Sequence, residues 1–417
     1  MKYSNHTTTD VDVVVIGAGA SGLAATRTLL NCGKTVLTLE ARDRIGGRAW
    51  TDTSIFGIPF DLGCRYLHDG PVNPWVEYAK DNKFELYPES EHLHFLKAGG
   101  TPLSAEEIGD FEHRFNNGIR LILDKGKVGK DISVSSILST EDKWEKYVAN
   151  MLGLWTFGIE TNMLSTLDFY QATGHGQDWF CRQGYGNVIS HYGQNIPVRL
   201  NTPVKRIQWG DHGVTLKTDS GTIKAKTIII TVSTGVLASE NIIFDPPLPS
   251  WKTRAIEELP MIKCNHIALK FEKDIFDLGS DQAILLEDDY RIGITSNISN
   301  TSMVLVWVGG KLASYLEEDR KERSIEFALS KIESLLGTKV LQDYTKGVTT
   351  SWGQDPWSFG SYSMAKPGSH HYRKSLCLPI DQKLFFTGEA CNNKYISSCH
   401  GAFLSGVDAA IRVSKVV

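Results

Sequence analysis

The chain has 417 residues, which is long for one ordinary domain and predicts two. Hydrophobic residues make up 41% and charged residues 22%, a globular composition with enough apolar side chains for two cores. The net charge of −4 indicates no nucleic-acid surface, and no apolar run reaches the roughly 18 residues of a membrane span, so we expect neither partner. The seven cysteines form no Cys-x-x-Cys pair, which favours a reduced, cytoplasmic setting, and no metal site is expected.

In chain order, the first residues have an α/β pattern. An apolar strand at 11–16 leads into a glycine turn, a helix from about 21 to 31 and a second strand at 34–40. Beyond them, helical and strand-rich segments alternate. The elements that we expect there are amphipathic helices in 104–169, short strands in 198–232 and 261–310, a helix at 320–337, a strand at 383–387 and a final helix from about 401.

The order of these elements predicts an α/β fold with interleaved domains. Segments with the α/β pattern of a nucleotide-binding domain occur at the start, in the middle and at the end of the chain. Two segments with a different pattern are inserted between them. We expect a discontinuous nucleotide-binding domain made of 1–85, 180–260 and 378–417. An α+β substrate-binding domain of mixed sheet and helices then takes 86–179 and 261–377.

The strongest motif is the glycine pattern after the first strand. Gly17, Gly19 and Gly22 form G-x-G-x-x-G between a strand and a helix. Glycine permits the tight turn and lets the backbone approach a pyrophosphate, which the helix N-terminus then attracts. Glu40 ends the second strand, where a carboxylate can bond a ribose hydroxyl. The sequence therefore predicts a dinucleotide site.

The segment after Glu40, ARDRIGGRAWT, resembles the G-G element of flavoproteins, in which Gly46 and Gly47 let Arg48 reach the pyrophosphate of FAD. With further blocks, the sequence is similar to the flavin-containing amine oxidases, a group that includes monoamine oxidases, polyamine oxidases and lysine-specific histone demethylases. Its sequence motifs resemble those of the polyamine oxidases most. The blocks are FDLGCRYLHDG (60–70), RQGYGNVI (182–189), NTPVKRI (201–207), TIIITVSTGVL (227–237), SWGQDPWSFGSYS (351–363) and LFFTGEACNNKYISSCHGAFLSGVDAA (384–410).

This resemblance implies a Rossmann-like, glutathione-reductase-like FAD-binding domain. FAD is expected to be held without a covalent bond, because no cysteine lies beside Tyr362. The cofactor contacts expected from the glycine motif and the resemblance are Gly17, Gly19, Ser21, Gly22, Glu40, Arg42, Gly47, Arg48, Arg65, Tyr66, Val204, Gly388, Glu389, Ser398 and Cys399.

The implied reaction is oxidation of an amine C–N bond. A hydride passes from the α-carbon to flavin N5, the imine hydrolyses to an aldehyde and an amine, and molecular oxygen or another acceptor takes the electrons. The resemblance places Tyr362 at the flavin face with Trp352 behind it, and His68 beside the substrate path. Ser398 stands near the position where plant polyamine oxidases and monoamine oxidases carry a second aromatic, so the expected site is wide and favours a polyamine or secondary amine.

Other residues leave alternatives open. Relatives usually carry a lysine where this chain has His266, which leaves oxidase against dehydrogenase, or a weakly active FAD-binding protein, undecided. Lys263 is expected on the opposite face of the strand. An L-amino-acid oxidase would need an arginine such as Arg65 for the substrate carboxylate. Glu160 and Asp168 are candidates for binding a distal ammonium, and the oligomeric state is not predicted.

Overall fold

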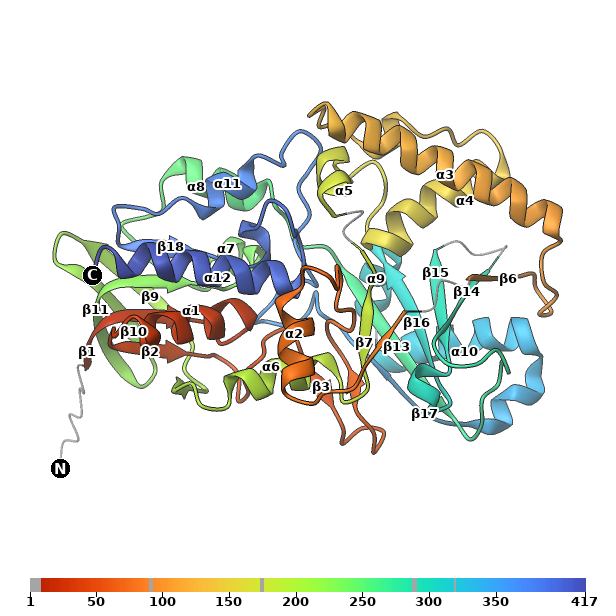
Figure 1. The fold of residues 1–417 in the computed structure, drawn as a ribbon, viewed down its shortest axis with the longest axis horizontal. Coiled ribbons are helices and arrows are strands. Elements are labelled where there is room, and N and C mark those ends of the chain that lie inside the picture. The colour runs from red at the N-terminus through yellow and green to blue at the C-terminus, as the bar shows by residue number, and fades with distance from the viewer. Residues whose placement is uncertain (1–8, 90–92, 173–175, 287–290, 319) are drawn as a thin grey trace.

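The computed structural model describes residues 9–89, 93–172, 176–286, 291–318 and 320–417. They form two lobes, each built around its own large β-sheet (Figure 1). The chain crosses between the lobes several times, so residues distant in sequence meet where the lobes join.

The first lobe is built on an eight-stranded sheet, in the order β12-β9-β10-β11-β1-β2-β8 with β18 beside β11. Its strands are β1 (Thr9–Ile16), β2 (Val36–Leu39), β8 (Val198–Arg199), β9 (Val204–Gly210), β10 (Gly213–Thr218), β11 (Gly221–Ile230), β12 (Ile243–Asp245) and β18 (Leu384–Phe386). The central strand β1 pairs in parallel with β2 and β11. Its run Val13–Val15 is fully buried, as expected for a parallel strand covered on both faces.

Helices cover both faces of this sheet. Val13 and Val15 pack toward α1 (Ala20–Asn31) and α12 (Cys399–Ser414), which lie side by side (Figure 1). Val14 and Ile16 point the other way, into a core shared with α7 (Thr234–Ala238), α8 (Ser250–Glu257) and α11 (Tyr372–Cys377). This alternation follows from the two-residue period of a strand.

The second lobe is built on a six-stranded sheet, in the order β17-β13-β16-β15-β14-β6. Its strands are β6 (Leu93–Leu96), β13 (Cys264–Phe271), β14 (Gln282–Leu286), β15 (Ile292–Ser296), β16 (Met303–Gly309) and β17 (Tyr344–Thr349). All neighbours pair antiparallel except β14 and β6. The helices of this lobe are α3 (Ala105–Lys127), α4 (Lys143–Asn150), α5 (Thr166–Ala172), α9 (Gly310–Glu317) and α10 (Lys321–Leu336).

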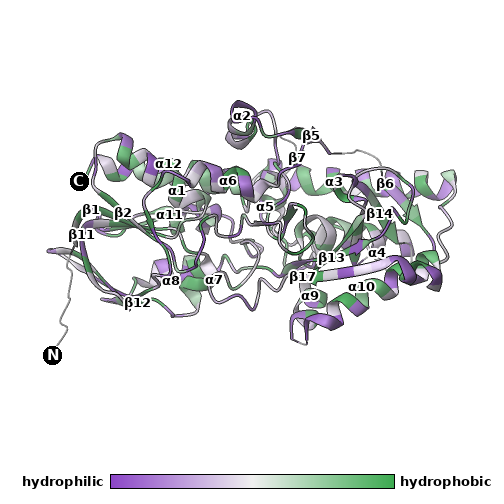
Figure 2. Cartoon of the chain, turned by 90° about the horizontal axis from the view of Figure 1, so that it is seen from below, coloured by the Kyte–Doolittle hydropathy of each residue, from purple (hydrophilic) through white to green (hydrophobic). Residues whose placement is uncertain are grey.

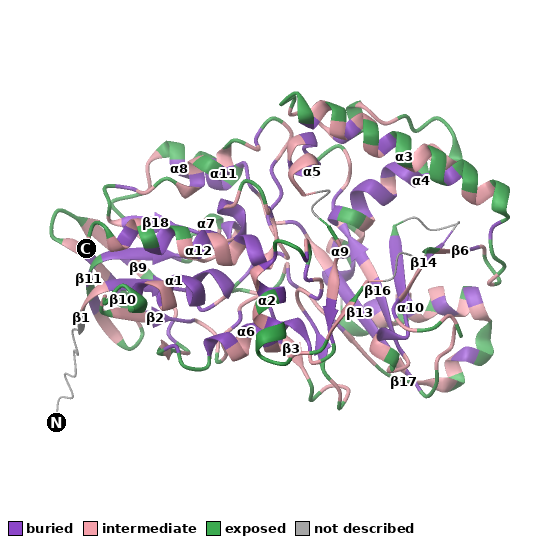
Figure 3. Ribbon diagram, in the orientation of Figure 1, coloured by how far each residue is buried: buried purple, intermediate pink, exposed green. Residues whose placement is uncertain are grey.

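Local sequence explains where these helices begin and which face they bury. Ser104 and Glu107 form a capping box at the start of α3, and Asp142 and Glu145 form another at α4. Both hydrophilic and hydrophobic residues occur along α3 and α10 (Figure 2). Their outward faces are exposed, whereas the sheets are largely buried (Figure 3).

Small elements connect the lobes. Two short antiparallel pairs are β3 (Thr51–Asp52) with β4 (Phe60–Asp61), and β5 (Leu86–Pro88) with β7 (Trp179–Cys181). The helices near them are α2 (Pro74–Asp81) and α6 (Tyr185–Gly193). In the β5–β7 pair, Pro88 lies opposite Trp179. This register brings residues 89 and 178 to the same end of the pair.

The observed elements agree closely with the expected ones. The first helix begins one residue before the expected start, and the last begins at Cys399 rather than near 401, because the Ser398 side chain caps it. The mixed α/β architecture with a parallel sheet centre matches the predicted fold class, while the residue boundaries of the two domains stay a prediction. Within the described ranges, no helix combines the length and apolar character that crossing a membrane requires.

Candidate active site

A cavity of about 970 Å³ runs from the glycine turn of the first lobe into the second lobe. This volume is at the upper end of the range for small-molecule sites. Except for Gly22, every residue predicted from the sequence to contact the cofactor or to lie at the reacting centre lines it, whereas the two ammonium candidates Glu160 and Asp168 do not. The fold therefore gathers positions from 17 to 399 around one space.

One end of the cavity is the turn between β1 and α1. Gly17 has φ +103°, and a Cβ there would lie 2.4 Å from the Thr231 hydroxyl oxygen, so the turn needs glycine. Gly22 has a packing role instead, because a Cβ there would lie 1.8 Å from the Gly17 carbonyl oxygen. No side chain caps α1 at Gly19, which leaves the N–H groups of its first turn available to an anion.

Glu40 lies at the end of β2, beside this turn. Its carboxylate accepts hydrogen bonds from the Ala18 N–H at 2.7 Å and the Arg42 N–H at 2.9 Å. These bonds fix a buried carboxylate at the cavity wall, where the sequence predicted a ribose contact. Val204 and Ser21 line the same end of the cavity.

Two arginines line the middle of the cavity, and both are paired with acids. The Arg42 guanidinium donates to both carboxylate oxygens of Asp355, each at 2.8 Å. Arg48 donates to the Glu389 carboxylate and to the Ser361 carbonyl, both at 2.9 Å. The remaining N–H groups of a guanidinium can still donate to a phosphate, since the group has five donors.

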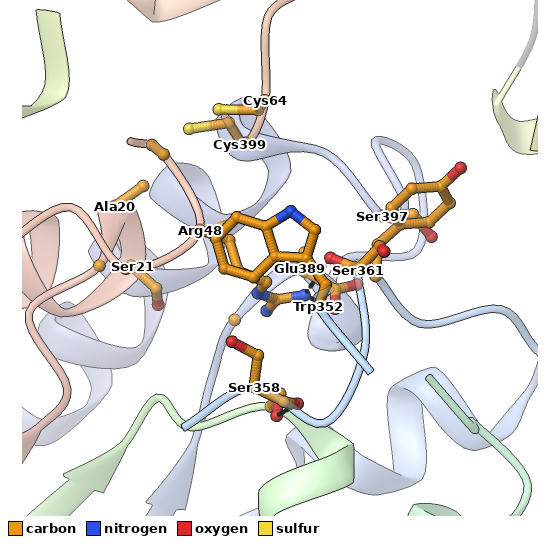
Figure 4. A pocket seen from close by; sticks show the side chains of 18 of the residues that line it. Ala20, Ser21, Arg48, Cys64, Trp352, Ser358, Ser361, Glu389, Ser397 and Cys399 are labelled. Carbon is orange, nitrogen blue, oxygen red and sulfur yellow. Dashed lines mark hydrogen bonds and ion pairs between the residues drawn. The ribbon is translucent and has the colours of Figure 1, made fainter. Parts of the chain in front are cut away.

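Trp352 and Tyr362 lie where the first lobe meets the second. Trp352 is buried, and its indole N–H donates to the Leu62 carbonyl at 3.1 Å. The backbone of Tyr362 is fixed by a bond from the Ile262 N–H at 2.8 Å, and burial raises the pKa of its phenol well above the usual value. Figure 4 shows the Trp352 indole among the side chains that line the cavity, and the Cys64 and Cys399 side chains next to each other.

The cavity has more aromatic residues in its wall than the sequence predicted. Trp307, Trp155, Phe157 and Tyr395 also line the cavity. The positions of Tyr362 at the flavin face and of Trp352 behind it stay predictions. Trp307 comes from β16 and Trp155 from a π-helical turn, neither of which belongs to the blocks that carried the resemblance.

His266 lies on β13 and is buried against Trp307, with 4.1 Å between the ring centroids. Its Nδ1 lies 3.3 Å from the Asp61 carbonyl oxygen. Burial lowers the pKa of His266 to about 4, although the Asp61 carbonyl opposes this shift, so the ring is neutral at pH 7. Lys263 does not line the cavity, and its ammonium pairs instead with Glu317 at 3.6 Å.

His68 lies at the far end of the cavity with two acids that sequence reasoning missed, Asp178 and Glu89. Its Nδ1 lies 2.6 Å from the Asp178 carboxylate, and its ring stacks on Tyr66 at 5.3 Å. Half of the His68 side-chain surface (50%) is exposed to solvent, and the residue lines the cavity. Burial opposes protonation there, yet the hydrogen bond and charge of Asp178 outweigh it and raise the pKa of His68.

Glu89 is the most perturbed acid of this group. Burial, followed by repulsion from Asp178, raises the pKa of the Glu89 carboxyl from 4.5 to about 7. The only sequence signal for this pair is that both residues adjoin apolar strand residues, Pro88 and Trp179, and their pairing is not visible before the fold.

Two charged candidates from the sequence serve the structure instead. Asp168 is fully buried and binds Arg373, at 3.1 and 2.6 Å, together with His370 at 2.7 Å, so it cannot bind an ammonium in the cavity. Glu160 accepts from the Lys311 N–H at 2.9 Å and does not line the cavity. Neither candidate is therefore placed to bind an ammonium in the cavity, because backbone or cationic partners of the protein itself use these carboxylates.

Arg65 is buried and forms an ion pair with Asp281. Its other terminal nitrogen, Nη1, has no hydrogen-bond partner within the ranges that the structure describes. The Ser398 hydroxyl accepts from the Gly401 N–H at 3.0 Å and donates to the Tyr395 carbonyl at 2.8 Å, so it caps α12 at the cavity wall. The roles of Arg65, Tyr66, Ser398, Cys399 and Gly388 as cofactor contacts stay predictions.

The cavity fits FAD. The uncapped N-terminus of α1 suits a pyrophosphate, and the fixed Glu40 carboxylate suits a ribose hydroxyl. At Gly47 a Cβ would lie 3.3 Å from the Gly19 Cα, so these glycines let two backbone segments close around the pyrophosphate position. The aromatic and thiol-lined middle suits a flat ring system.

Comparison with known proteins identifies the family. The model of the flavin-containing amine oxidoreductases matches residues 20–152 and 131–414. Polyamine oxidase 4 of Oryza sativa subsp. japonica is 30% identical over 97% of this chain and 88% of its own length. Polyamine oxidase 2 of Arabidopsis thaliana is 31% identical over 95% of this chain and 87% of its own length. A structure of putrescine oxidase bound to putrescine superposes with a TM-score of 0.82, at 19% identity over 97% of this chain and 99% of that one. The chain therefore belongs to the flavin-containing amine oxidoreductases, with FAD as its cofactor, and is an FAD-dependent amine oxidase.

Proposed function

We propose that this enzyme oxidises a polyamine or another secondary amine that carries a second positive charge. The observation that carries this proposal is the pair of carboxylates, Asp178 and Glu89, at the end of the cavity that contains His68. An ammonium at this end would meet two acids. The polyamine and putrescine oxidases to which the chain is similar support the same substrate class.

The residues between this end and Tyr362 suit the carbon chain of such an amine. Trp307, Trp155 and Phe157 provide apolar walls, and aromatic faces can hold an amine without fixing it in a salt bridge. Asp178 and Glu89 then bind the distal ammonium, and the aromatic walls exclude water from the reacting carbon. FAD, when bound, supplies the two-electron chemistry by accepting a hydride from the α-carbon at N5.

His266 bears on the fate of the product and of the electrons. With Nδ1 directed at the Asp61 carbonyl, Nε2 is the nitrogen left to hold a water near the reacting centre. Such a water would hydrolyse the imine to an aldehyde and a smaller amine. Because the ring is neutral at pH 7, it adds no positive charge beside the flavin, and we propose that reaction with molecular oxygen is slow in this enzyme.

A carboxylate-bearing substrate is less well supported. Arg65, the arginine that would bind the carboxylate of an L-amino acid, is already charge-paired with Asp281, which leaves only its Nη1 without a partner within the described ranges. At the His68 end of the cavity, Asp178 and the ionised form of Glu89 would repel an anion, against the attraction of protonated His68. The charges of the cavity therefore favour an amine substrate over an L-amino acid.

An anaerobic screen of flavin reduction tests the proposal. The FAD-loaded protein is mixed without oxygen with spermidine, putrescine, cyclohexylamine or L-leucine, and the loss of visible flavin absorbance gives the reduction rate and the substrate Kd. Spermidine is expected to reduce the flavin with the lowest Kd. Admitting oxygen afterwards times reoxidation.

Variants separate the acidic end from general effects. Asp178→Asn should weaken spermidine binding by about tenfold and leave the Kd of cyclohexylamine unchanged. The matched control is Asp124→Asn, on the exposed face of α3, where neither Kd should change. L-leucine as the best substrate, or equal effects of Asp178→Asn on monoamine and polyamine, would overturn the proposal.

A further inference from the structure

A second group of reactive side chains lies outside the cavity, behind the segment that carries Glu389. Cys377 ends α11, and Cys391 ends the 3-10 turn Glu389–Cys391. Both cysteines are free, and they pack in the same core cluster of the first lobe, on two elements that contact each other. Cys391 is buried, whereas Cys377 is only half-buried and reachable by a small molecule.

Cations surround this thiol pair. The Arg412 guanidinium, from α12, lies 3.2 Å from the Cys377 Sγ and 3.4 Å from its carbonyl oxygen. The Lys252 ammonium, from α8, donates to the carbonyls of Leu376 and Leu378, both at 2.6 Å, on either side of Cys377. Opposing these cations is Asp408, which pairs with Arg412 at 3.0 Å.

This environment favours the thiolate of Cys377. The hydrogen bond from Cys391 lowers the pKa of Cys377 most, and the charge and hydrogen bond of Arg412 add to it, against the effect of burial and of Asp408. The hydrogen bond with Cys377, burial and the charge of Cys377 raise the pKa of Cys391 well above its usual value, against the effect of Lys252, so it stays a thiol. An accessible thiolate next to a second thiol is the arrangement of peroxide-sensitive cysteines.

We propose that Cys377 and Cys391 form a peroxide-reactive dithiol, in which Cys377 is the attacking sulfur and Cys391 the resolving one. The Cys377 thiolate attacks one oxygen of hydrogen peroxide, so that an S–O bond forms, the O–O bond breaks and one water leaves after proton transfer. The Cys391 thiol then attacks the Cys377 sulfur, an S–S bond forms, the S–O bond breaks and a second water leaves. Two thiols are oxidised by two electrons, and one peroxide is reduced to two waters.

The chain contains a matched comparison for this pair. Cys64 and Cys399 lie next to each other (Figure 4), but the hydrogen bond to Cys399 and burial raise the pKa of Cys64 well above its usual value. Cys64 therefore stays a thiol, and both residues line the cavity that fits FAD. We expect Cys64 to react with peroxide at least about tenfold more slowly than Cys377.

Peptide mapping of the FAD-loaded protein tests the proposal without any variant. The protein is treated with increasing hydrogen peroxide in the absence of amine, and remaining thiols are alkylated. Cleavage after lysine and arginine places Cys377 in SLCLPIDQK and Cys391 in LFFTGEACNNK. One equivalent of peroxide should link these two peptides by a disulfide that a reductant reverses, while Cys64 and Cys399 remain alkylated.

Variants assign the two roles. In Cys391→Ser, a sulfenic acid at Cys377 should accumulate and be trapped by dimedone. In Arg412→Gln, which keeps both cysteines, disulfide formation should be severalfold slower than in the wild type. Cys32→Ser, at an exposed thiol, should leave the reaction unchanged. Oxidation of Cys64, Cys399 or Cys32 before Cys377, or no linked peptide at excess peroxide, would overturn the proposal. Because peroxide is added directly, the result does not depend on which amine the enzyme oxidises.

Discussion

The raised pKa of Glu89, at the end of the cavity, predicts how the binding of a cation depends on pH. The pKa of Glu89 is about 7 in the free enzyme, so its carboxyl changes from mostly neutral at pH 6 to mostly ionised at pH 8. A cation bound beside the ionised form gains about 1.4 kcal/mol, or tenfold, at a partly buried site. By linkage, binding then lowers the pKa of Glu89 to about 6 in the complex. The dissociation constant should therefore fall about fivefold as the pH rises from 6 to 8.

The assay needs a ligand whose own charge does not titrate. Decamethonium, a bis-quaternary alkane, meets this condition, and its inhibition constant is measured against anaerobic flavin reduction by spermidine at pH 6, 7 and 8. In Glu89→Gln the change with pH should shrink, and the part that remains belongs to His68, whose raised pKa makes it lose its charge as the pH rises. Glu112→Gln, on the exposed face of α3, is the matched control. A Glu89→Gln enzyme with the wild-type pH dependence would refute the reasoning.

Three further predictions concern the flavin environment and the fold. His266→Lys should speed reoxidation by oxygen with little change in anaerobic reduction, because it places a cation where a neutral ring now lies; an equal or slower rate in stopped-flow reoxidation would contradict this. Asp168→Asn should lower the free energy of unfolding by about 3–5 kcal/mol, since it leaves the fully buried Arg373 charge without its partner; urea unfolding measures this. Gly22→Ala should yield protein with little bound flavin, because its Cβ would lie 1.8 Å from the Gly17 carbonyl; the ratio of flavin to protein absorbance reports the loss.

The stability prediction has an internal control. Asp124 and Arg120 form an ion pair at 3.2 Å with 61% of each side chain exposed. Asp124→Asn should change the free energy of unfolding by less than about 0.5 kcal/mol. A similar loss in both variants would mean that burial does not decide the strength of these pairs.

The fold and the cofactor end of the site could be predicted because they depend on local pattern. The run before Gly17 is buried on both faces, and Gly17, Gly19 and Glu40 act through turn geometry that any dinucleotide fold of this type needs. The same reasoning placed Lys263 away from the cavity, since strand alternation decides its side.

The substrate end could not be predicted in the same way. Glu89 and Asp178 are far apart in sequence and meet only through the β5–β7 register. Asp168 looked equally available, but its use depends on Arg373, an unremarked residue of a short helix. Whether a carboxylate faces a cavity or a buried guanidinium is decided by tertiary packing, which composition and periodicity do not encode.

A continuous polar chain runs from Asp168 to Arg48. Asp168 binds Arg373, which donates to Ser363 at 3.1 Å; Ser363 donates to Glu389 at 2.6 Å, and Glu389 accepts from Arg48 at 2.9 Å. Asp168 lies on α5 of the second lobe, whereas Glu389 and Arg48 belong to the first, so this chain of bonds ties the two lobes together at the cavity wall. A substitution at Asp168 is therefore expected to change the surroundings of Glu389 and Arg48, although neither of them touches Asp168.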